Sequence, residues 1–276
     1  MQNRIEKQFE GFIKTPPLWK NSFQQLVQFK LPEINTPLQQ SVTEDLPSLS
    51  SNFVMGKRVE RFFEWIIRQN PDYDLLSENI QISRNKITQG ELDFLLKDLL
   101  TQKVIHVEMV YKFYIYDPSF DSEMQGWIGP NRRDTLLQKT KKLKEKQFPL
   151  LFKPETKDLL TSLSLNSEEM LQQTCFKANL FVPKQLQDKH FSYINNKCIT
   201  GTWLHFKDFI SAQYRKFQFY VPTKQDWPIL PKHGETWVDH SEIITQIETQ
   251  FQNKKTPLIW MKKSKNNYER LFVVWW

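Results

Sequence analysis

Two stretches of the sequence, GELDFLL at residues 90–96 and HVEMVYK at residues 106–112, decide how this chain is expected to fold. Both are rich in apolar side chains and are typical of strands that face a core. Both also carry carboxylates, with Glu91 and Asp93 in the first and Glu108 in the second. Because a buried carboxylate without a partner is strongly unfavourable, the fold is expected to supply a cation or donors at these positions.

Strand alternation indicates which of these side chains meet. If the two strands pair antiparallel, Asp93 and Glu108 can lie on one face, with His106 and Lys112 on the face of Glu108 and Glu91 at the strand mouth. Two carboxylates that share a site repel each other, and a divalent cation with oxygen ligands removes that repulsion. The alternative is a structural ion pair of Asp93 or Glu108 with Lys112 or a neighbouring arginine. For His106, a lone strand histidine is most often a satisfied core group.

The flanking segments predict further helices and strands. Residues 52–70 have the spacing of a core-facing helix, with Glu60 at the edge of its apolar stripe, either as a ligand or as a partner of Lys57 or Arg61. Strands are predicted over 75–82, 90–100 and 103–117. The stripe consists of Val59, Phe62, Phe63, Ile66 and Ile67.

A second helix is predicted to begin at Asn131 as its N-cap. Leu136, Thr140, Leu143 and Gln147 share one face of this helix, and a flank of basic residues lies beside them. These residues are candidate phosphate contacts, although such a flank is often only a solvated face. The basic residues are Arg132, Lys139, Lys142 and Lys146.

Outside this core, residues 8–30 suggest one or two short helices broken at Pro16-Pro17, followed by a connector over 31–51. The C-terminal half predicts a helix over 240–252 and several strands. We expect one domain with an N-terminal helical segment and connector (1–51), a core (52–185) and a β-rich C-terminal extension (186–276). The strands are expected over 175–183, 201–206, 216–222, 256–263 and 269–276.

Composition narrows the class of protein. The chain has 276 residues, a net charge of +7 and two cysteines, and its pI is near 9.2. The charge favours an anionic partner, with nucleic acid ahead of membrane. The absence of a signal-like or membrane-spanning stretch and of a disulfide framework predicts a cytoplasmic protein. No HExxH, CxxC or phosphate-loop motif is present, so the ligands of any metal should be carboxylates.

The order of these elements resembles the PD-(D/E)XK nuclease superfamily, which has the restriction-endonuclease-like fold. More narrowly, the chain resembles a bacterial family of domain-of-unknown-function proteins placed in that superfamily. The resemblance implies an α/β fold with a mixed central sheet flanked by helices. The matching stretches are FIKTPPLW (12–19), GKRVERFFEW (56–65), GELDFLLKD (90–98), HVEMVYKFY (106–114), GPNRRDTLLQKTKKL (129–143), ANLFVP (178–183) and GTWLHF (201–206).

This resemblance also implies roles for particular residues. Asp93, Glu108 and Glu60 would bind Mg²⁺ or Mn²⁺, with the carbonyl of Met109 as a further ligand. Lys112 would be the catalytic lysine, and the reaction would be metal-assisted phosphodiester hydrolysis of DNA or RNA.

One position departs from the family signature, Glu-x-Lys, because Val110 stands two residues after Glu108. The displaced lysine leaves open an alternative, a nucleic-acid-binding or scaffold protein that keeps the fold without the chemistry. A third possibility is a different phosphate ester as the substrate, because fold does not fix function.

Overall fold

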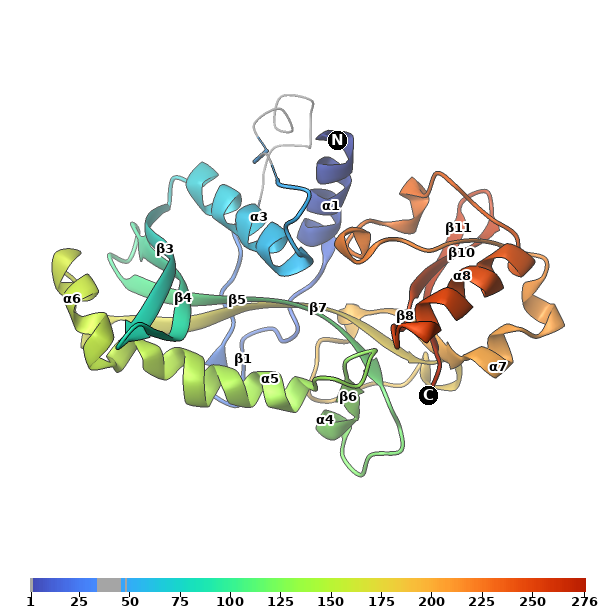
Figure 1. Ribbon diagram of the computed structural model, residues 1–276. Coiled ribbons are helices and arrows are strands. Elements are labelled where there is room, and N and C mark those ends of the chain that lie inside the picture. Colours follow the sequence, from blue (N-terminus) through green and yellow to red (C-terminus); the bar gives the residue numbers. More distant parts are fainter. Residues whose placement is uncertain (1, 34–45, 48) are drawn as a thin grey trace. The chain divides into compact units, whose positions relative to one another are not determined.

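The computed structural model of the chain describes residues 2–33, 46–47 and 49–276 (Figure 1). Most of the connector expected over 31–51 therefore lies outside the described residues. The chain forms two compact units, each built from separate segments. We name them the carboxylate unit (Pro17–Tyr111 and Gln138–Lys177) and the C-terminal unit (Met1–Pro16, Lys112–Leu137 and Ala178–Trp276). The boundaries expected at residues 51 and 185 stay a prediction.

The sheet of the carboxylate unit has the strand order β3-β4-β5-β7. β3 (Tyr73–Arg84) pairs antiparallel with β4 (Ile87–Asp98), and β4 pairs antiparallel with β5 (Val104–Tyr116). The strands predicted over 75–82, 90–100 and 103–117 are confirmed. β5 and β7 (Leu171–Pro183) each continue into segments that belong to the C-terminal unit.

Helices cover both faces of this sheet (Figure 1). On one face lies α3 (Met55–Gln69), whose predicted apolar stripe is buried, and its Phe63 ring packs 4.6 Å from the ring of Phe94 on β4. Leu92 and Leu95 of β4 pack against residues of the elements that follow α5, including Leu150 and Leu160. Those elements are α5 (Leu136–Lys142), a π-helical turn (Leu143–Gln147), a 3-10 turn (Phe148–Phe152) and α6 (Pro154–Ser162).

The prediction that the second helix begins at Asn131 is wrong. The helix begins at Leu136, because the preceding residues form a turn in which the Gly129 N–H donates to the Asp134 carbonyl. The Asn131 side chain accepts from the Thr256 N–H instead of capping a helix. Of the four residues predicted to share one face of the helix, Leu136, Thr140 and Leu143 are buried and Gln147 is half-buried.

At the N-terminal end, α1 (Gln2–Lys14) confirms the first helical pattern. The second pattern is a hairpin instead, in which β1 (Ser22–Phe23) pairs antiparallel with β2 (Leu26–Val27). Gln24 and Gln25 between the strands have φ values of 48° and 71°. Two consecutive left-handed residues make the tight turn that suits a two-residue hairpin and that a helix excludes.

The C-terminal unit holds the strand order β7-β8-β11-β10-β9. β8 is parallel to β7 and to β11, whereas β10 is antiparallel to both of its neighbours. Together with the strands of the carboxylate unit, this pattern makes the fold a mixed α/β one with a large mixed sheet flanked by helices, as predicted. The strands are β8 (Ile199–His205), β9 (Gln218–Tyr220), β10 (Leu258–Ser264) and β11 (Asn267–Val274).

All five strands and the helix expected in this half are confirmed. The helix is α8 (His240–Gln252), whose Ile243 and Ile247 pack in a core with Ile259 and Val273. The elements that were not predicted include α4 (Glu123–Gly126), β6 (Trp127–Ile128), which pairs with β5, and α7 (Phe206–Phe209), as well as α6 and several 3-10 turns. No helix in the described part of the chain is long and apolar enough to cross a membrane.

Candidate functional site

The candidate site lies where β4 and β5 separate. Their backbone pairing runs from Lys97↔Val104 to Phe94↔Val107 and ends there. The next opposed pair would be Asp93 and Glu108, as strand alternation predicts. At this point the Met109 N–H donates a hydrogen bond of 2.8 Å to Asp93 Oδ2, so that a side chain takes the place of the backbone acceptor. Asp93 thus occupies the opening at the end of the β4–β5 ladder.

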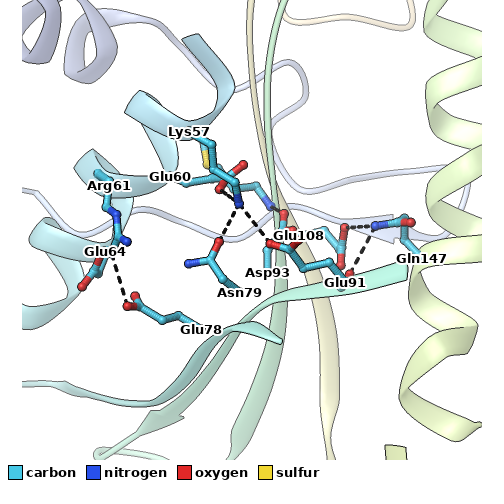
Figure 2. Close-up of polar contacts among 11 residues, drawn as sticks. Lys57, Glu60, Arg61, Glu64, Glu78, Asn79, Glu91, Asp93, Glu108 and Gln147 are labelled. Carbon is cyan, nitrogen blue, oxygen red and sulfur yellow. Dashed lines mark hydrogen bonds and ion pairs between the residues drawn. The ribbon is translucent and has the colours of Figure 1, made fainter. Parts of the chain in front are cut away.

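Glu108 is buried, with 1% of its surface exposed. Its Oε1 lies 3.0 Å from His106 Nε2, and its Oε2 accepts a hydrogen bond of 3.0 Å from Gln147 Nε2 (Figure 2). His106 is itself fully buried, and its Nδ1 lies 3.2 Å from Gln172 Nε2. His106 is therefore a satisfied core group, as expected, and it helps to hold the Glu108 carboxylate in place.

Asp93 carries the clearest electrostatic signal of the site. Burial and then the charge of Glu108 raise its pKa well above the usual range, and the charge of Glu60 adds to this. The Met109 N–H and the charge of Lys139 act in the opposite direction without cancelling the rise. A proton on Asp93, or a cation beside it, would relieve the repulsion between the Asp93 and Glu108 carboxylates. A strongly raised pKa beside a second carboxylate makes Asp93 a candidate functional residue.

Glu60 approaches the site from α3 but is held by a lysine on the same helix. The Lys57 ammonium lies 2.7 Å from Glu60 Oε2 and 3.0 Å from Glu91 Oε1. It also donates a hydrogen bond of 2.8 Å to Asn79 Oδ1 on β3 (Figure 2). Burial raises the pKa of Glu60 despite this ion pair. Glu60 therefore forms the ion pair with Lys57 that was one of the two alternatives expected for it. Glu91 contacts the same ammonium group.

Asn79 adopts an unusual backbone conformation for a residue inside a strand. Its φ is 50°, in the left-handed region that non-glycine residues rarely enter and that asparagine tolerates better than most. Strained backbone of this kind is concentrated at functional sites. Here it accompanies the contact between the Asn79 side chain and Lys57.

Lys112 and Arg132 belong to the C-terminal unit, and each has a partner there. The Lys112 ammonium lies 2.6 Å from Asp134 Oδ2. Arg132 lies 3.3 Å from Asp117 Oδ2, and its guanidinium stacks 4.3 Å from the centre of the Trp276 ring. The prediction that Arg132 lies on the flank of the basic helix is wrong, because the helix begins only at Leu136.

The other three predicted basic residues lie on the helical run of the carboxylate unit. Lys142 and Lys146 are exposed, and Lys139 is half-buried. The run is π-helical over Leu143–Gln147, which changes the angular spacing of Lys146, so the shared flank of Lys139, Lys142 and Lys146 stays a prediction.

The donors of the site suit a hard divalent cation, because carboxylate oxygens are the ligands that Mg²⁺ and Mn²⁺ prefer. The mutual repulsion of Asp93 and Glu108 is also what such a cation would offset. In the described part of the chain, however, no three His, Cys, Asp or Glu residues are already arranged to hold a metal ion. In this arrangement Glu60 contacts Lys57, and Glu108 contacts Gln147.

Sequence reasoning named Lys57 as a partner of Glu60 but missed its contacts with Glu91 and Asn79. It also missed the role of Gln147, which was placed on one face of the second helix but donates to an acceptor 39 residues away in the chain. Nothing in the sequence pointed to Asn79.

The fold and the site together define a mixed α/β protein with a buried and a half-buried carboxylate, Glu108 and Asp93, at an opening between two strands. The family described as "Domain of unknown function (DUF1853)" matches residues 7–274, and the chain belongs to this family. Searches of the curated proteins and of the solved structures find no match to the chain.

Proposed function

We propose that this protein is a divalent-metal-dependent nuclease that hydrolyses phosphodiester bonds in nucleic acid. The observation that carries the proposal is the position of Asp93 opposite Glu108, with the pKa of Asp93 raised by burial and by that neighbour. The resemblance to the PD-(D/E)XK superfamily, if it reflects a shared function, would assign these two positions to metal ligation.

In this proposal, Asp93 and Glu108 are the principal ligands of Mg²⁺ or Mn²⁺. The Met109 carbonyl is a further ligand, because the N–H and C=O of a strand residue point to the same side and the Met109 N–H points to Asp93. Glu60 completes the set after it leaves Lys57. A bound divalent cation would supply an activated water and would offset the charge that develops on the phosphate.

The protein's own groups orient this site. Gln147 and His106 hold the two oxygens of Glu108, which fixes the carboxylate relative to β5. Such support of a ligand by neighbouring donors is general in metal sites. Lys139, Lys142 and Lys146 would bind the phosphates of the nucleic acid, which fits the net charge of +7. The catalytic role proposed for Lys112 rests on its place in the resemblance alone.

A second candidate is a nucleic-acid-binding protein without catalysis. The observation that favours it is that both oxygens of Glu108 and one oxygen of Glu60 already have partners within the protein. A carboxylate cluster satisfied in this way can serve the fold alone.

The deciding experiment measures the cleavage of single-stranded, duplex and structured DNA and RNA with Mg²⁺, Mn²⁺ or EDTA. We expect metal-dependent cleavage by the wild type and none by Asp93→Asn, while the matched control Glu145→Gln, an exposed carboxylate of the same unit, stays active. Cleavage that persists in Asp93→Asn would contradict the proposal. Nucleic-acid binding without cleavage, unchanged in Asp93→Asn, would establish the second candidate.

Lys112→Met tests the lysine assignment in the same assay. If Lys112 is catalytic, this variant loses cleavage but keeps the metal-induced rise in melting temperature. Normal cleavage by Lys112→Met would exclude the assignment.

A further inference from the structure

Lys57 is in direct contact with two carboxylates at the site, Glu60 and Glu91. Its ammonium touches groups from three elements, namely Glu60 on α3, Asn79 on β3 and Glu91 on β4 (Figure 2). The side chain is 46% exposed, so that it can move without disturbing the core. These contacts make Lys57 the counter-ion of Glu60 and Glu91.

The position of this counter-ion matters because Glu60 is one of the groups the proposed metal site needs. Within the carboxylate unit, the charges of Glu60 and Glu108 both act on Asp93. The Lys57 ammonium has three N–H donors, and its neighbours Glu60, Glu91 and Asn79 leave none of them for Asp93. A divalent cation could take oxygens from Glu60 and Asp93 together.

We propose that the Lys57 ammonium competes with the divalent cation for Glu60, so that the site is loaded by exchange of one cation for the other. This inference rests on the proposed metal site. In the exchange, Glu60 passes from Lys57 to the divalent cation, and Lys57 keeps its contacts with Glu91 and Asn79. Lys57 is thus a positioning residue that sets how tightly the metal is held.

Competition and a purely structural role of Lys57 predict opposite changes in Mn²⁺ affinity when Lys57 is removed. If Lys57 only ordered Glu60 and Glu91 for ligation, its removal would weaken metal binding. If it competes, Lys57→Met should tighten Mn²⁺ binding by about two- to five-fold, which is the scale of one partly exposed ion pair. Lys57→Arg keeps the charge and should bind Mn²⁺ about as the wild type does.

The experiment is a calorimetric titration of the full-length chain with Mn²⁺, with no substrate and no readout of cleavage. Lys144→Met is the matched control, because it removes an exposed lysine from the same unit and so the same net charge. The gain in affinity must exceed that of Lys144→Met. It must also disappear when Lys57→Met is combined with Glu60→Gln, because the competition is for that carboxylate. Thermal melts in EDTA confirm that each variant is folded.

The outcomes separate this inference from the proposed function. Mn²⁺ binding that Asp93→Asn abolishes but that Lys57→Met leaves unchanged or weakened would overturn the inference alone. A gain that persists with Glu60→Gln would also overturn it. Absence of Mn²⁺ binding in both the wild type and Lys57→Met would overturn the inference and the metal site together.

Discussion

The Met109 N–H donates to Asp93 Oδ2 over 2.8 Å at the first position beyond the last backbone pair of β4 and β5. This hydrogen bond holds Asp93 opposite Glu108 and favours its charged form. Burial and the charge of Glu108 disfavour that form more strongly. Asp93 therefore holds its proton more tightly than an ordinary carboxyl group does.

The raised pKa of Asp93 predicts a specific dependence of stability on pH. The folded protein holds the proton of Asp93 more tightly than the unfolded chain does. The stability that Asp93 contributes is therefore complete below about pH 4 and is lost as the pH rises through the raised pKa. Asp93→Asn cannot ionise and keeps an oxygen for the Met109 N–H. In EDTA, the stability of Asp93→Asn relative to the wild type should therefore increase from pH 4 to pH 8.

Urea unfolding of both proteins at several pH values measures this difference. Glu145→Gln, the exposed control, should run parallel to the wild type. A difference between Asp93→Asn and the wild type that is constant with pH would contradict the prediction.

Gln147 is expected to stabilise the fold through Glu108. In Gln147→Ala, Oε2 of the buried Glu108 loses its donor, and a buried charged acceptor without a partner costs about 1–3 kcal/mol. Lys144→Ala, an exposed change in the same helical turn, should cost less than about 0.5 kcal/mol. Equal unfolding free energies for the two variants would show that the Gln147 contact is dispensable.

The exposed lysines of the helical run predict where nucleic acid binds. The double variant Lys142→Glu/Lys146→Glu should bind duplex DNA or RNA about tenfold more weakly and show a smaller dependence of affinity on salt. Lys141→Glu/Lys144→Glu changes the net charge equally at positions off the predicted flank. Fluorescence anisotropy across a salt series compares them, and equal losses would indicate a general charge effect instead of a binding face.

In the C-terminal unit, Glu10 provides a test of acid stability. Burial alone would raise its pKa, but hydrogen bonds from Lys14, Lys232 and His233 outweigh burial and lower the pKa to about 2. A lowered pKa contributes stability that is complete above the unfolded value near 4.5 and is lost as the pH falls through about 2.

Glu10→Gln should therefore be less stable than the wild type at pH 7, by about 1 kcal/mol. The difference should vanish towards pH 2. Glu248→Gln, an exposed carboxylate of the same unit, is the control and should match the wild type at both pH values. A deficit of Glu10→Gln that is as large at pH 2 as at pH 7 would refute the assignment.

Local pattern was sufficient for most of the secondary structure. The apolar residues of α3, β5, β10 and β11 are largely buried, and their spacing along the sequence therefore matches the helix or strand that they form. The pattern was insufficient for residues 22–30, where a turn of two left-handed glutamines prevails over a short helical spacing. It was also insufficient at Asn131, where a partner 125 residues away takes the side chain expected to cap a helix.

The amino-acid sequence by itself indicated that Asp93 and Glu108 could share one face of an antiparallel pair, because side chains alternate along each strand. The register of β4 and β5, which places them opposite each other, was decided by the tertiary structure. The sequence also could not determine which groups neutralise them. Lys57 meets Glu91 across 34 residues, and Gln147 meets Glu108 across 39. These contacts depend on how helices pack on the two faces of the sheet, so the charge balance of the site is a property of the tertiary fold.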